Sequence, residues 1–592
     1  MKKRISVALA LGVILMAVLV QADARRAHAP RQSNPALQRA LRQGTDVQRL
    51  PNGLPVPQIS GGVLTSAREA LAARSGAAAR VARTNRGFNP KINAKTAGCP
   101  NVFRKHGFPD NIRANQDCSL RRQAEIQVAV NPKSASNIIL GQNDSRVGFN
   151  QTGLDWTING GKNWGDYSIP TRFLNCATGA YDAFSDPSQA FARDGTLGYV
   201  GVAFNLASPT SGLYYWEGGT KGSSLHAPGN PLSATPSTIY DNCADPTKSP
   251  DKQFVAIDTT GGAHSGNIYV TFTLFGSDAG GNYLESPIYL ARSTDAGASW
   301  DPVKRISGRN SSVCVKADAF DPGINPSECN FDQGSWPVVA KDGSVNVVFN
   351  NCNTDSAADS GFGVCQQLFV KSTDGGVHWS KPVKVADDYA LQPIQTGDLP
   401  NGCDQGRQCL PPNGYRMNDF PSMGIANKSG KLAVFWADFR NGCNPQFDCT
   451  GKPNSNNDVF AAISTDGGAH WGHTKLVDRN KAAQWQPWGD VGEDGRLYVA
   501  YYDRRYGNAE KTGANDITLS VSSNNGRTWH HRRITTRSMP NLTPANNPNQ
   551  FGFLGDYMGL VVANGWVHIG WADTRGLEGF VEEDAYYARV RA

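Results

Sequence analysis

Apolar and polar residues alternate along most of the chain from residue 125 onward, and this period of two is typical of β-strands with one buried face. The alternation comes in paired segments, in which two strands flank a tight turn at Gly or Asn. Seven segments follow this template: IQVAVNPKSASNIILGQNDSR, QAFARDGTLGYVGVAFN, FVAIDTTGGAHSGNIYVTFT, PVVAKDGSVNVVFN, PSMGIANKSGKLAVFWADFR, PWGDVGEDGRLYVAYYDRR and YMGLVVANGWVHIGWADTR. The pattern therefore predicts seven copies of one β-rich unit.

A phrase of eight residues recurs between these pairs. Three copies read Ser-Thr-Asp-x-Gly-x-x-Trp, at 293–300, 372–379 and 464–471, and two relaxed copies carry Asn for Asp, at 157–164 and 522–529. The Asp or Asn side chain can accept backbone N–H groups and the Gly can take a positive φ, so we expect a tight hairpin turn. We expect the Trp to bury its ring between neighbouring sheets, which makes the phrase a folding device. Its Asp or Asn position is occupied by Asn159, Asp295, Asp374, Asp466 and Asn524.

The phrase resembles the Asp-box, or bacterial neuraminidase repeat, of the sialidase-like β-propellers. The resemblance covers roughly residues 125–592 and implies an all-β propeller of four-stranded antiparallel blades. The paired segments predict seven blades, with six as the alternative if one unit is decoration. An eroded copy of the phrase is expected after SGLYYWEGG. The last unit ends after its third strand, EDAYYARV, so a strand within 100–116 is expected to close the ring.

The N-terminus has the layout of a secretory signal. Basic residues at 2–4 precede an apolar run over 5–20 and a small-x-small step at 22–24. We therefore expect residues 1–24 to be cleaved and the protein to be secreted, to an extracellular or periplasmic space. An uncleaved anchor is the alternative.

The rest of the chain divides into two parts by composition. Residues 25–98 are rich in Ala, Arg, Pro and Gly and poor in large apolar residues, which predicts a flexible, low-complexity lead. Residues 99–592 contain no linker and form the predicted propeller. An unbroken stretch of this length favours a repeat architecture over one ordinary core.

Cysteine usage and charge narrow the chemistry. The 12 cysteines suit an exported protein with disulfides, and the zinc-type clusters that metal sites need are missing, so we expect no metal and no cofactor. The formal net charge is only +7 and the Lys and Arg residues are scattered, so we expect no nucleic-acid ligand. No stretch after the N-terminal apolar run approaches the length of a membrane span, so we expect no stable membrane insertion. We also expect a monomer. Four local disulfides are predicted: Cys314 with Cys329, Cys352 with Cys365, Cys403 with Cys409, and Cys443 with Cys449.

Ligand chemistry is expected on the face opposite the eight-residue phrase, where the ends of the inner strands converge on a central channel. A second motif, Asp-x-Arg, is predicted to end the second strand of four units. Each pair either locks its own loop by a charge-assisted hydrogen bond or presents an arginine that binds an anionic sugar. The proposed substrate-binding residues are Arg146, Arg440, Arg505, Arg575, Asp438, Asp503 and Asp573, with Asp144 completing the first pair.

The resemblance also implies catalytic groups. Sialidases use a Tyr nucleophile partnered by a Glu, an Asp acid/base and three arginines that grip the substrate carboxylate. Tyr557, in GDYMGL, resembles the nucleophile in its placement, and Arg146 with Asp144 resembles the first-blade ending. Tyr557, Asp144 and Asp556 are the catalytic candidates. Acidic residues that precede inner strands widen the choice of general acid: Asp186, Asp251, Asp332, Asp419 and Asp556.

Four long inserts that carry the cysteine pairs are predicted to rise on the ligand face. They span 307–333, 351–365, 387–418 and 440–457, and stapled loops on one side suit the walls of a groove for an extended polysaccharide. Surface decoration is the alternative.

The sequence leaves two candidate functions. The first is a secreted glycoside hydrolase of the sialidase-like superfamily, acting as an exo- or endo-enzyme on an acidic glycan, with a polysaccharide lyase as a variant. The second is a non-catalytic propeller that binds a glycan or a protein at the cell surface. The second is favoured by the absence of the Phe-Arg-Ile-Pro signature, since AEIQVAV stands in its place.

Overall fold

The computed structural model places most of the chain after residue 110. The residues that it describes are 47–49, 55–57, 102–103, 111–116, 122–146, 150–169, 181–205, 210–219, 221–316, 327–354, 364–389, 409–410, 415–442, 457–506, 512–542, 553–576 and 582–592. The predicted signal at 1–24, nearly all of the lead at 25–98, and Cys403, Cys443 and Cys449 lie outside the described residues.

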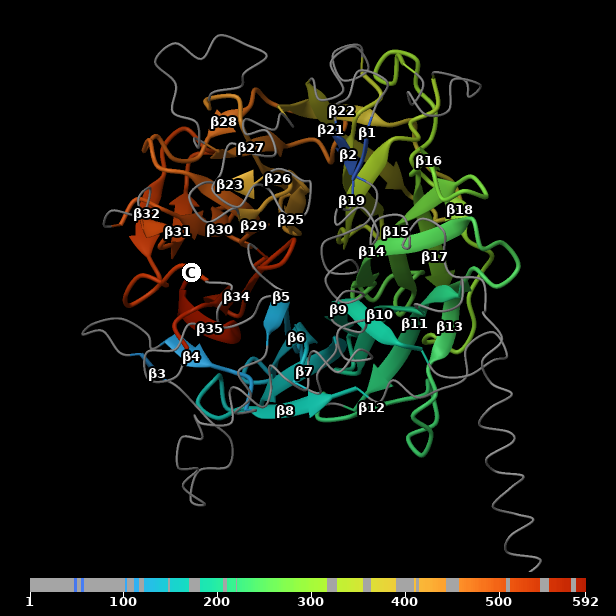
Figure 1. The fold of residues 1–592 in the computed structure, drawn as a ribbon, viewed down its shortest axis with the longest axis horizontal. Coiled ribbons are helices and arrows are strands. Elements are labelled where there is room, and N and C mark those ends of the chain that lie inside the picture. Colours follow the sequence, from blue (N-terminus) through green and yellow to red (C-terminus); the bar gives the residue numbers. More distant parts are fainter. Residues whose placement is uncertain are drawn as a thin grey trace, which may run out of the picture.

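Seven antiparallel sheets surround a central axis, as Figure 1 shows from the succession of colours around the ring. This confirms the seven-bladed propeller. The strands of blades one to three are β5 (Gln123–Val130), β6 (Ile138–Asp144), β7 (Gln151–Thr157), β8 (Gly165–Ser168); β9 (Ala183–Phe191), β10 (Leu197–Phe204), β11 (Ser211–Gly218), β12 (Leu225–His226), β13 (Ser237–Asp241); β14 (Lys248–Ile257), β15 (Ile268–Ser277), β16 (Tyr283–Glu285), β17 (Ile288–Ser293) and β18 (Lys304–Arg305).

The remaining blades repeat the plan, and two short hairpins lie outside it. The strands of blades four to seven are β19 (Asp332–Val339), β20 (Val345–Asn351), β21 (Cys365–Ser372), β22 (Val383–Asp388); β25 (Ser422–Ala426), β26 (Lys431–Asp438), β27 (Asp458–Ser464), β28 (Lys475–Leu476); β29 (Gln484–Val491), β30 (Leu497–Asp503), β31 (Asp516–Ser522), β32 (His530–Arg533); β33 (Gly559–Ala563), β34 (Trp566–Asp573) and β35 (Asp584–Arg591). The hairpins are β1 (Val47–Arg49) with β2 (Pro55–Pro57), and β23 (Cys409–Leu410) with β24 (Tyr415–Arg416).

The ring is closed by a strand from the N-terminal side of the propeller. β4 (Asn111–Arg113) pairs with β35, and β3 (Val102–Phe103) pairs with β4, so the last sheet takes its outer strands from residues that precede blade one. Arg113 Nη2 lies 2.6 Å from Asp584 Oδ1 across this junction, and both side chains are buried. The predicted closing strand within 100–116 is thereby confirmed.

Register defines two faces of the disc. In blade three, Ile268 opens the second strand and pairs with Ile257, the end of the first strand, and with Ser293, the end of the third. The turns between strands one and two and between strands three and four therefore share one face, here called the turn face. The opposite face, the loop face, carries the starts of the inner strands and the ends of the second strands.

The hydrophobic core is divided among the interfaces between neighbouring blades. One cluster joins Val200 and Val202 of blade two to Val270 and Phe272 of blade three, and similar clusters occur around the ring. The inner strands β5, β9, β14, β19, β25, β29 and β33 contact one another in ring order, with β33 returning to β5. Each strand alternates its side chains between two such interfaces, which explains the period of two in the sequence.

The eight-residue phrase forms the turn between strands three and four, here called the repeat turn. In blade three, Ser293 Oγ donates to Asp295 Oδ1 over 2.7 Å, and the Ser299 N–H donates to the same carboxylate over 2.9 Å. The Gly297 N–H donates to Ser293 Oγ over 2.9 Å, and Gly297 has φ 87°. Asn159, Asp374, Asp466 and Asn524 accept equivalent bonds in their own turns.

The repeat turns also fasten each blade to the one before it. Trp300 of blade three lies with its ring centroid 5.5 Å from that of Tyr215 in blade two, and Trp471 of blade five lies 5.5 Å from Phe369 in blade four. Blade two has no copy of the phrase, but the turn after SGLYYWEGG does join its third and fourth strands. The phrase is therefore a folding element on the turn face, as its sequence suggested.

Two of the predicted disulfides lie among the described residues, and both are present. Cys314 is bonded to Cys329, and Cys352 is bonded to Cys365. Among the residues that the structure describes, no helix has the length and apolar character needed to cross a membrane.

Candidate functional site

The inner strands share an irregularity close to the loop face. β5, β9, β14, β19 and β29 each contain a register shift, and the shifted residue takes a positive φ that side-chain-bearing residues rarely adopt. Four such residues are Glu125, Asp186, Lys252 and Gln486, with φ of 57°, 55°, 53° and 47°. Glycines take the corresponding places in β19 and before β33. Strain of this kind is tolerated where a fold must aim a particular side chain, and it concentrates at functional sites.

These bulges bring opposite charges together at the axis. Lys252 Nζ lies 2.6 Å from Asp556 Oδ2, 2.9 Å from Asp186 Oδ2 and 3.4 Å from Glu125 Oε1. The four side chains come from blades one, two, three and seven, and each is at most 1% exposed. We call Glu125, Asp186, Lys252 and Asp556 the axial cluster.

Further polar groups hold the axial cluster in place. Asn143 Nδ2 donates to Glu125 Oε2 over 2.5 Å, and the backbone N–H of Asp556 donates to Glu125 Oε1 over 3.2 Å. Arg416 Nε lies 3.2 Å from Asp556 Oδ1, so a second cation contacts the cluster. Three carboxyl groups thus face two cations, and one protonated carboxyl makes the set neutral.

The environment selects Glu125 as the group that carries the proton. Burial raises its pKa well above the ordinary value of 4.5, and the neighbouring carboxylate of Asp186 raises the pKa further. Burial alone would lower the pKa of Lys252, but Asp186, Asp556 and Glu125 outweigh it and raise that pKa. Lys252 is therefore charged at neutral pH, and Glu125 is the carboxyl group whose surroundings favour the protonated form.

Aromatic rings close the channel beneath the axial cluster. Two residues after the positive-φ positions 252, 334, 486 and 555, the chain presents Phe254, Trp336, Trp488 and Tyr557, whose ring centroids lie 4.6 to 5.9 Å apart in five contacts. Lys252 Nζ lies 5.6 Å from the centroid of the Tyr557 ring. The axis is thus a charged layer over an aromatic floor, and not an open pore.

Tyr557, the nucleophile candidate, belongs to this floor. Its hydroxyl donates to the backbone oxygen of Pro187 over 3.1 Å, and the side chain is buried. Burial raises the pKa of Tyr557 well above 10, and the carboxyl groups of Glu125 and Asp186 raise it further. These surroundings favour the protonated phenol, so Tyr557 would need a neighbouring general base to act as a nucleophile.

The four Asp-x-Arg motifs each close on themselves. Arg146 Nε lies 2.5 Å from Asp144 Oδ2. In each of the other three motifs the arginine Nε also contacts the carboxylate of the aspartate two residues before it. Arg146, Arg440 and Arg505 have side chains 19% exposed, while Arg575 is buried. All four arginines follow the second strand, one strand outward from the axis. The geometry is that of the loop-locking alternative, and a ring of arginines around the axis is not formed.

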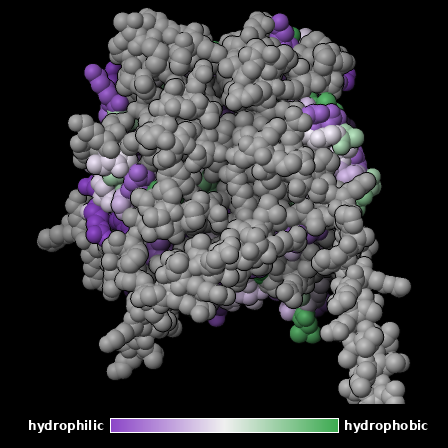
Figure 2. Space-filling model, in the orientation of Figure 1, coloured by the Kyte–Doolittle hydropathy of each residue, from purple (hydrophilic) through white to green (hydrophobic). Residues whose placement is uncertain are grey.

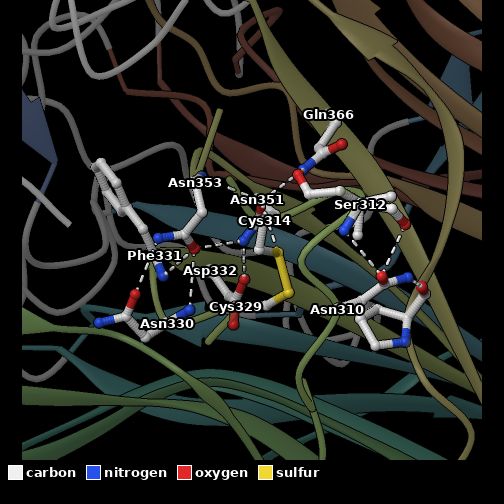
Figure 3. The surroundings of a disulfide bond; sticks show 12 residues. Asn310, Ser312, Cys314, Cys329, Asn330, Phe331, Asp332, Asn351, Asn353 and Gln366 are labelled. Atoms are coloured by element: carbon white, nitrogen blue, oxygen red, sulfur yellow. Dashed lines mark hydrogen bonds between the residues drawn. A yellow bond between two sulfur atoms is a disulfide. The ribbon is translucent and has the colours of Figure 1, made fainter. Parts of the chain in front are cut away.

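The other acidic candidates are dispersed. Asp186 and Asp556 belong to the axial cluster, whereas Asp251 accepts the backbone N–H of Lys252 over 2.8 Å. Asp419 lies beside Asp388. Burial raises the pKa of Asp388 most, and the nearby Asp419 raises it further. Asp332 is buried next to the Cys314–Cys329 disulfide, where Asn351 Nδ2 donates to it over 2.7 Å (Figure 3). Burial raises the pKa of Asp332 to about 8, so this side chain is a neutral acid beside the disulfide at neutral pH.

Sequence reasoning missed Glu125, Lys252 and Arg416. A signal for the first two was present, because the inner strands align as AEIQ, SDPS, DKQF, QGSW, WQPW and LGDY, with the second letter of each at the bulge. In that alignment one position carries Glu125, Asp186 and Lys252, charged residues where an inner strand should be apolar. Arg416 precedes blade five and gives no such signal.

Comparison with known proteins adds only general information. No protein-family model matches the chain, and no curated protein matches it either. Similar solved structures include a protein of unknown function from Dyadobacter fermentans, with 13% identity, a TM-score of 0.40, and coverage of 69% of this chain and 94% of that one. A Hadza microbial sialidase has 13% identity and a TM-score of 0.39, with coverage of 78% and 74%.

A polysaccharide lyase, an ulvan lyase, is also similar, with 8% identity, a TM-score of 0.41, and coverage of 80% of this chain and 95% of that one. Similarity at these levels carries no argument about the activity of this chain. In the described part of the chain, no group of three or more His, Cys, Asp or Glu side chains is arranged to hold a metal ion.

Proposed function

We propose that the protein is a secreted, carbohydrate-active propeller that cleaves a glycosidic bond in an acidic glycan, with the axial cluster as its catalytic centre. The observation that carries the proposal is the convergence of three carboxyl groups from separate blades on Lys252, with Glu125, Asp186 and Lys252 themselves at strained bulges. Paired carboxyl groups whose environments separate their pKa values are the usual equipment for glycoside hydrolysis.

The environments suggest different roles for the carboxyl groups. Glu125, whose pKa is raised by burial and by the carboxylate of Asp186, is proposed as the general acid that protonates the departing sugar oxygen. Asp556, which contacts both Lys252 and Arg416, is proposed to act as the base or nucleophile. Tyr557 becomes a floor residue beneath the sugar in this proposal, because its surroundings oppose ionisation.

The elements around the axis support an extended ligand. The inserts that contain the Cys314–Cys329 and Cys352–Cys365 disulfides begin at strand ends on the loop face, which is also the side of the bulges. Arg146, Arg440 and Arg505 end the second strands on this face and are partly exposed. They are proposed to meet the acidic groups of the glycan while their aspartates hold them in position.

The test is turnover on a panel of sialosides and uronate-containing polysaccharides, read as new reducing ends and, for a lyase, as absorbance of an unsaturated product. We expect Glu125→Gln and Asp556→Asn each to lose activity by about 100-fold or more. Asp494→Asn, an exposed change on the turn face, is the matched control and should keep full activity. Absence of turnover by the folded wild-type protein on every substrate would count against the proposal.

A second candidate is a non-catalytic glycan-binding propeller. The observation that favours it is the near-complete burial of the axial cluster. Buried ion pairs of this kind suit a structural role, in which they stabilise the contacts between blades at the axis. Glycan binding would then belong to the loops alone. Binding that survives Glu125→Gln and Asp556→Asn, together with no turnover by any form, would select this candidate.

A further inference from the structure

A cavity of about 660 Å³ lies at the rim between blades five and six, outside the axial cluster. One wall is β28 and the residues that follow it, and the other is the repeat turn of blade six with the start of β32. Its lining includes Lys475, Arg479, Arg527, Trp529 and His531. A volume in this range accommodates one or two sugar residues.

The cavity is cationic. Within the described part of the chain, the side chains of Lys475, Arg479 and Arg527 take part in neither an ion pair nor a hydrogen bond. The one acidic lining residue, Asp478, is engaged by Arg505 and accepts the Tyr501 hydroxyl over 2.8 Å. The positive charge of the lining is therefore not neutralised from within the protein.

Other blade junctions use their cations differently. Between blades three and four, Lys304 donates to the carbonyl of Val377, and Arg292 Nη1 donates to Gly375 O over 3.0 Å. Lys304 opens β18 as Lys475 opens β28, so the two lysines hold matching places. At the next junction, Lys371 Nζ lies 3.5 Å from Gly467 O.

The junction between blades five and six lacks this arrangement. Ile463 stands in the position of Arg292 and Lys371, one residue before the serine of the phrase, and its side chain cannot donate a hydrogen bond. Lys475 is left beside the repeat turn without a carbonyl partner. The cavity thus lies at a junction that lacks the hydrogen bonds from Lys or Arg to turn carbonyls that are present at two other junctions.

An indole N–H adds a second kind of unsatisfied donor. Trp164 Nε1 and Trp379 Nε1 each donate to a glycine carbonyl of their own turn over 3.1 Å. Among the residues that the structure describes, the buried Trp471 Nε1 and Trp529 Nε1 have no acceptor, and Trp529 lines the cavity. Its half-buried ring also offers an apolar surface of the kind on which a sugar ring packs.

We propose that this cavity, defined by Lys475, Arg479, Arg527 and Trp529, is a binding site for an acidic group of a polysaccharide, either a carboxylate or a sulfate. Arginine and lysine supply charge and N–H donors to such oxyanions, and the indole contacts the sugar that carries the group. The site is separate from the axis, so the inference holds whether or not the axial cluster is catalytic. It anchors the chain of a long acidic glycan at the rim of the propeller.

The test compares two triple variants of the full-length protein in binding to immobilised heparin, polygalacturonate and dextran. Lys475→Gln, Arg479→Gln and Arg527→Gln together remove the cavity charges. Lys341→Gln, Lys381→Gln and Lys428→Gln together remove three exposed charges elsewhere, so both variants change the net charge equally. Unfolding curves of both variants establish that they remain folded.

We expect the cavity variant to bind the acidic polymers at least tenfold more weakly than wild type, with a smaller dependence of affinity on salt, and the control variant to lose no more than twofold. Stronger loss with heparin identifies sulfate as the ligand group, and stronger loss with polygalacturonate identifies carboxylate. Equal losses in the two variants, or wild-type binding to dextran as tight as to the acidic polymers, would overturn the inference.

Discussion

At the scale of single residues, the account depends on the charges held around Lys252. A buried ammonium among three carboxyl groups is stable only because each charge has a partner, since an unpaired charge in the interior costs several kcal/mol. Glu125, Asp186 and Lys252 could have been recognised by aligning the inner strands, because they interrupt an apolar position. Their mutual contacts could not, because they come from strands more than sixty residues apart.

Lys252→Met is expected to destabilise the fold by about 3–5 kcal/mol at pH 7, because it leaves the carboxyl groups without their shared cation. Denaturant unfolding at pH 7 measures the loss. Lys341→Met, at an exposed site, is the control, and a similar loss in both variants would contradict the reasoning.

Asp332 gives a second residue-scale prediction, from its pKa of about 8 against an ordinary 3.8. The stability that its protonated form contributes is fully present below pH 3.8 and is lost as the pH rises toward 8. Asp332 should therefore reduce the free energy of unfolding by roughly 1.4 kcal/mol for each pH unit between these limits. Asp332→Asn should flatten the profile, and unchanged slopes in denaturant titrations from pH 4 to 9 would refute this origin.

At the scale of elements, the repeat turns show what a sequence motif can predict. The positions of Ser, Asp, Gly and Trp follow from hydrogen bonds and a positive φ within the turn, so the hairpins could be derived from the phrase alone. The partner of each Trp in the preceding blade could not, because it depends on the packing of two sheets. The Asp-x-Arg motifs show the same limit. Their pattern was compatible both with a local Asp–Arg hydrogen bond and with an anion-binding arginine, and only the structure shows that each arginine pairs with its own aspartate.

Gly468 illustrates the packing demand. It has φ 92°, and a Cβ there would lie 2.3 Å from the ring of Phe369 in the preceding blade, whereas a Cβ at Gly430, with φ 68°, would meet nothing within 4 Å. Gly430→Ala should cost about 1 kcal/mol from backbone strain alone. Gly468→Ala should cost roughly 1–3 kcal/mol more, because it adds overpacking between blades. Thermal unfolding of both variants measures the difference, and equal losses would show that the blade interface yields freely.

At the scale of the whole molecule, the ring is closed by a segment that precedes blade one. Counting paired segments predicted seven blades and a missing outer strand, and β4 supplies that strand beside β35. Among the described residues visible in Figure 2, the left edge of the disc carries strongly hydrophilic side chains, and the right edge carries both hydrophilic and hydrophobic ones. The aromatic floor was less predictable, because Trp336 and Trp488 could equally have packed between sheets.

The closure should be a point of weakness. Arg113 and Asp584 form a buried ion pair across it, and Arg113→Leu is expected to cost about 3–5 kcal/mol because it leaves a buried carboxylate without its cation. Arg496 pairs with Asp494 at the surface, so Arg496→Leu should cost less than about 1 kcal/mol. Denaturant midpoints of the two variants make the comparison. A small effect of Arg113→Leu would mean that the closing strand contributes little to the ring.

The proposal that Glu125 at the axis protonates a departing sugar is tested most directly by comparing two leaving groups in Glu125→Gln. Loss of a general acid slows cleavage of an ordinary glycosidic bond by about 100-fold or more, but it matters little for a dinitrophenyl glycoside, whose leaving group needs no proton. We predict a large loss on the oligosaccharide and a loss of less than about tenfold on the aryl glycoside. Equal losses on both, or full activity on both, would contradict the assignment of the axial cluster as a catalytic centre.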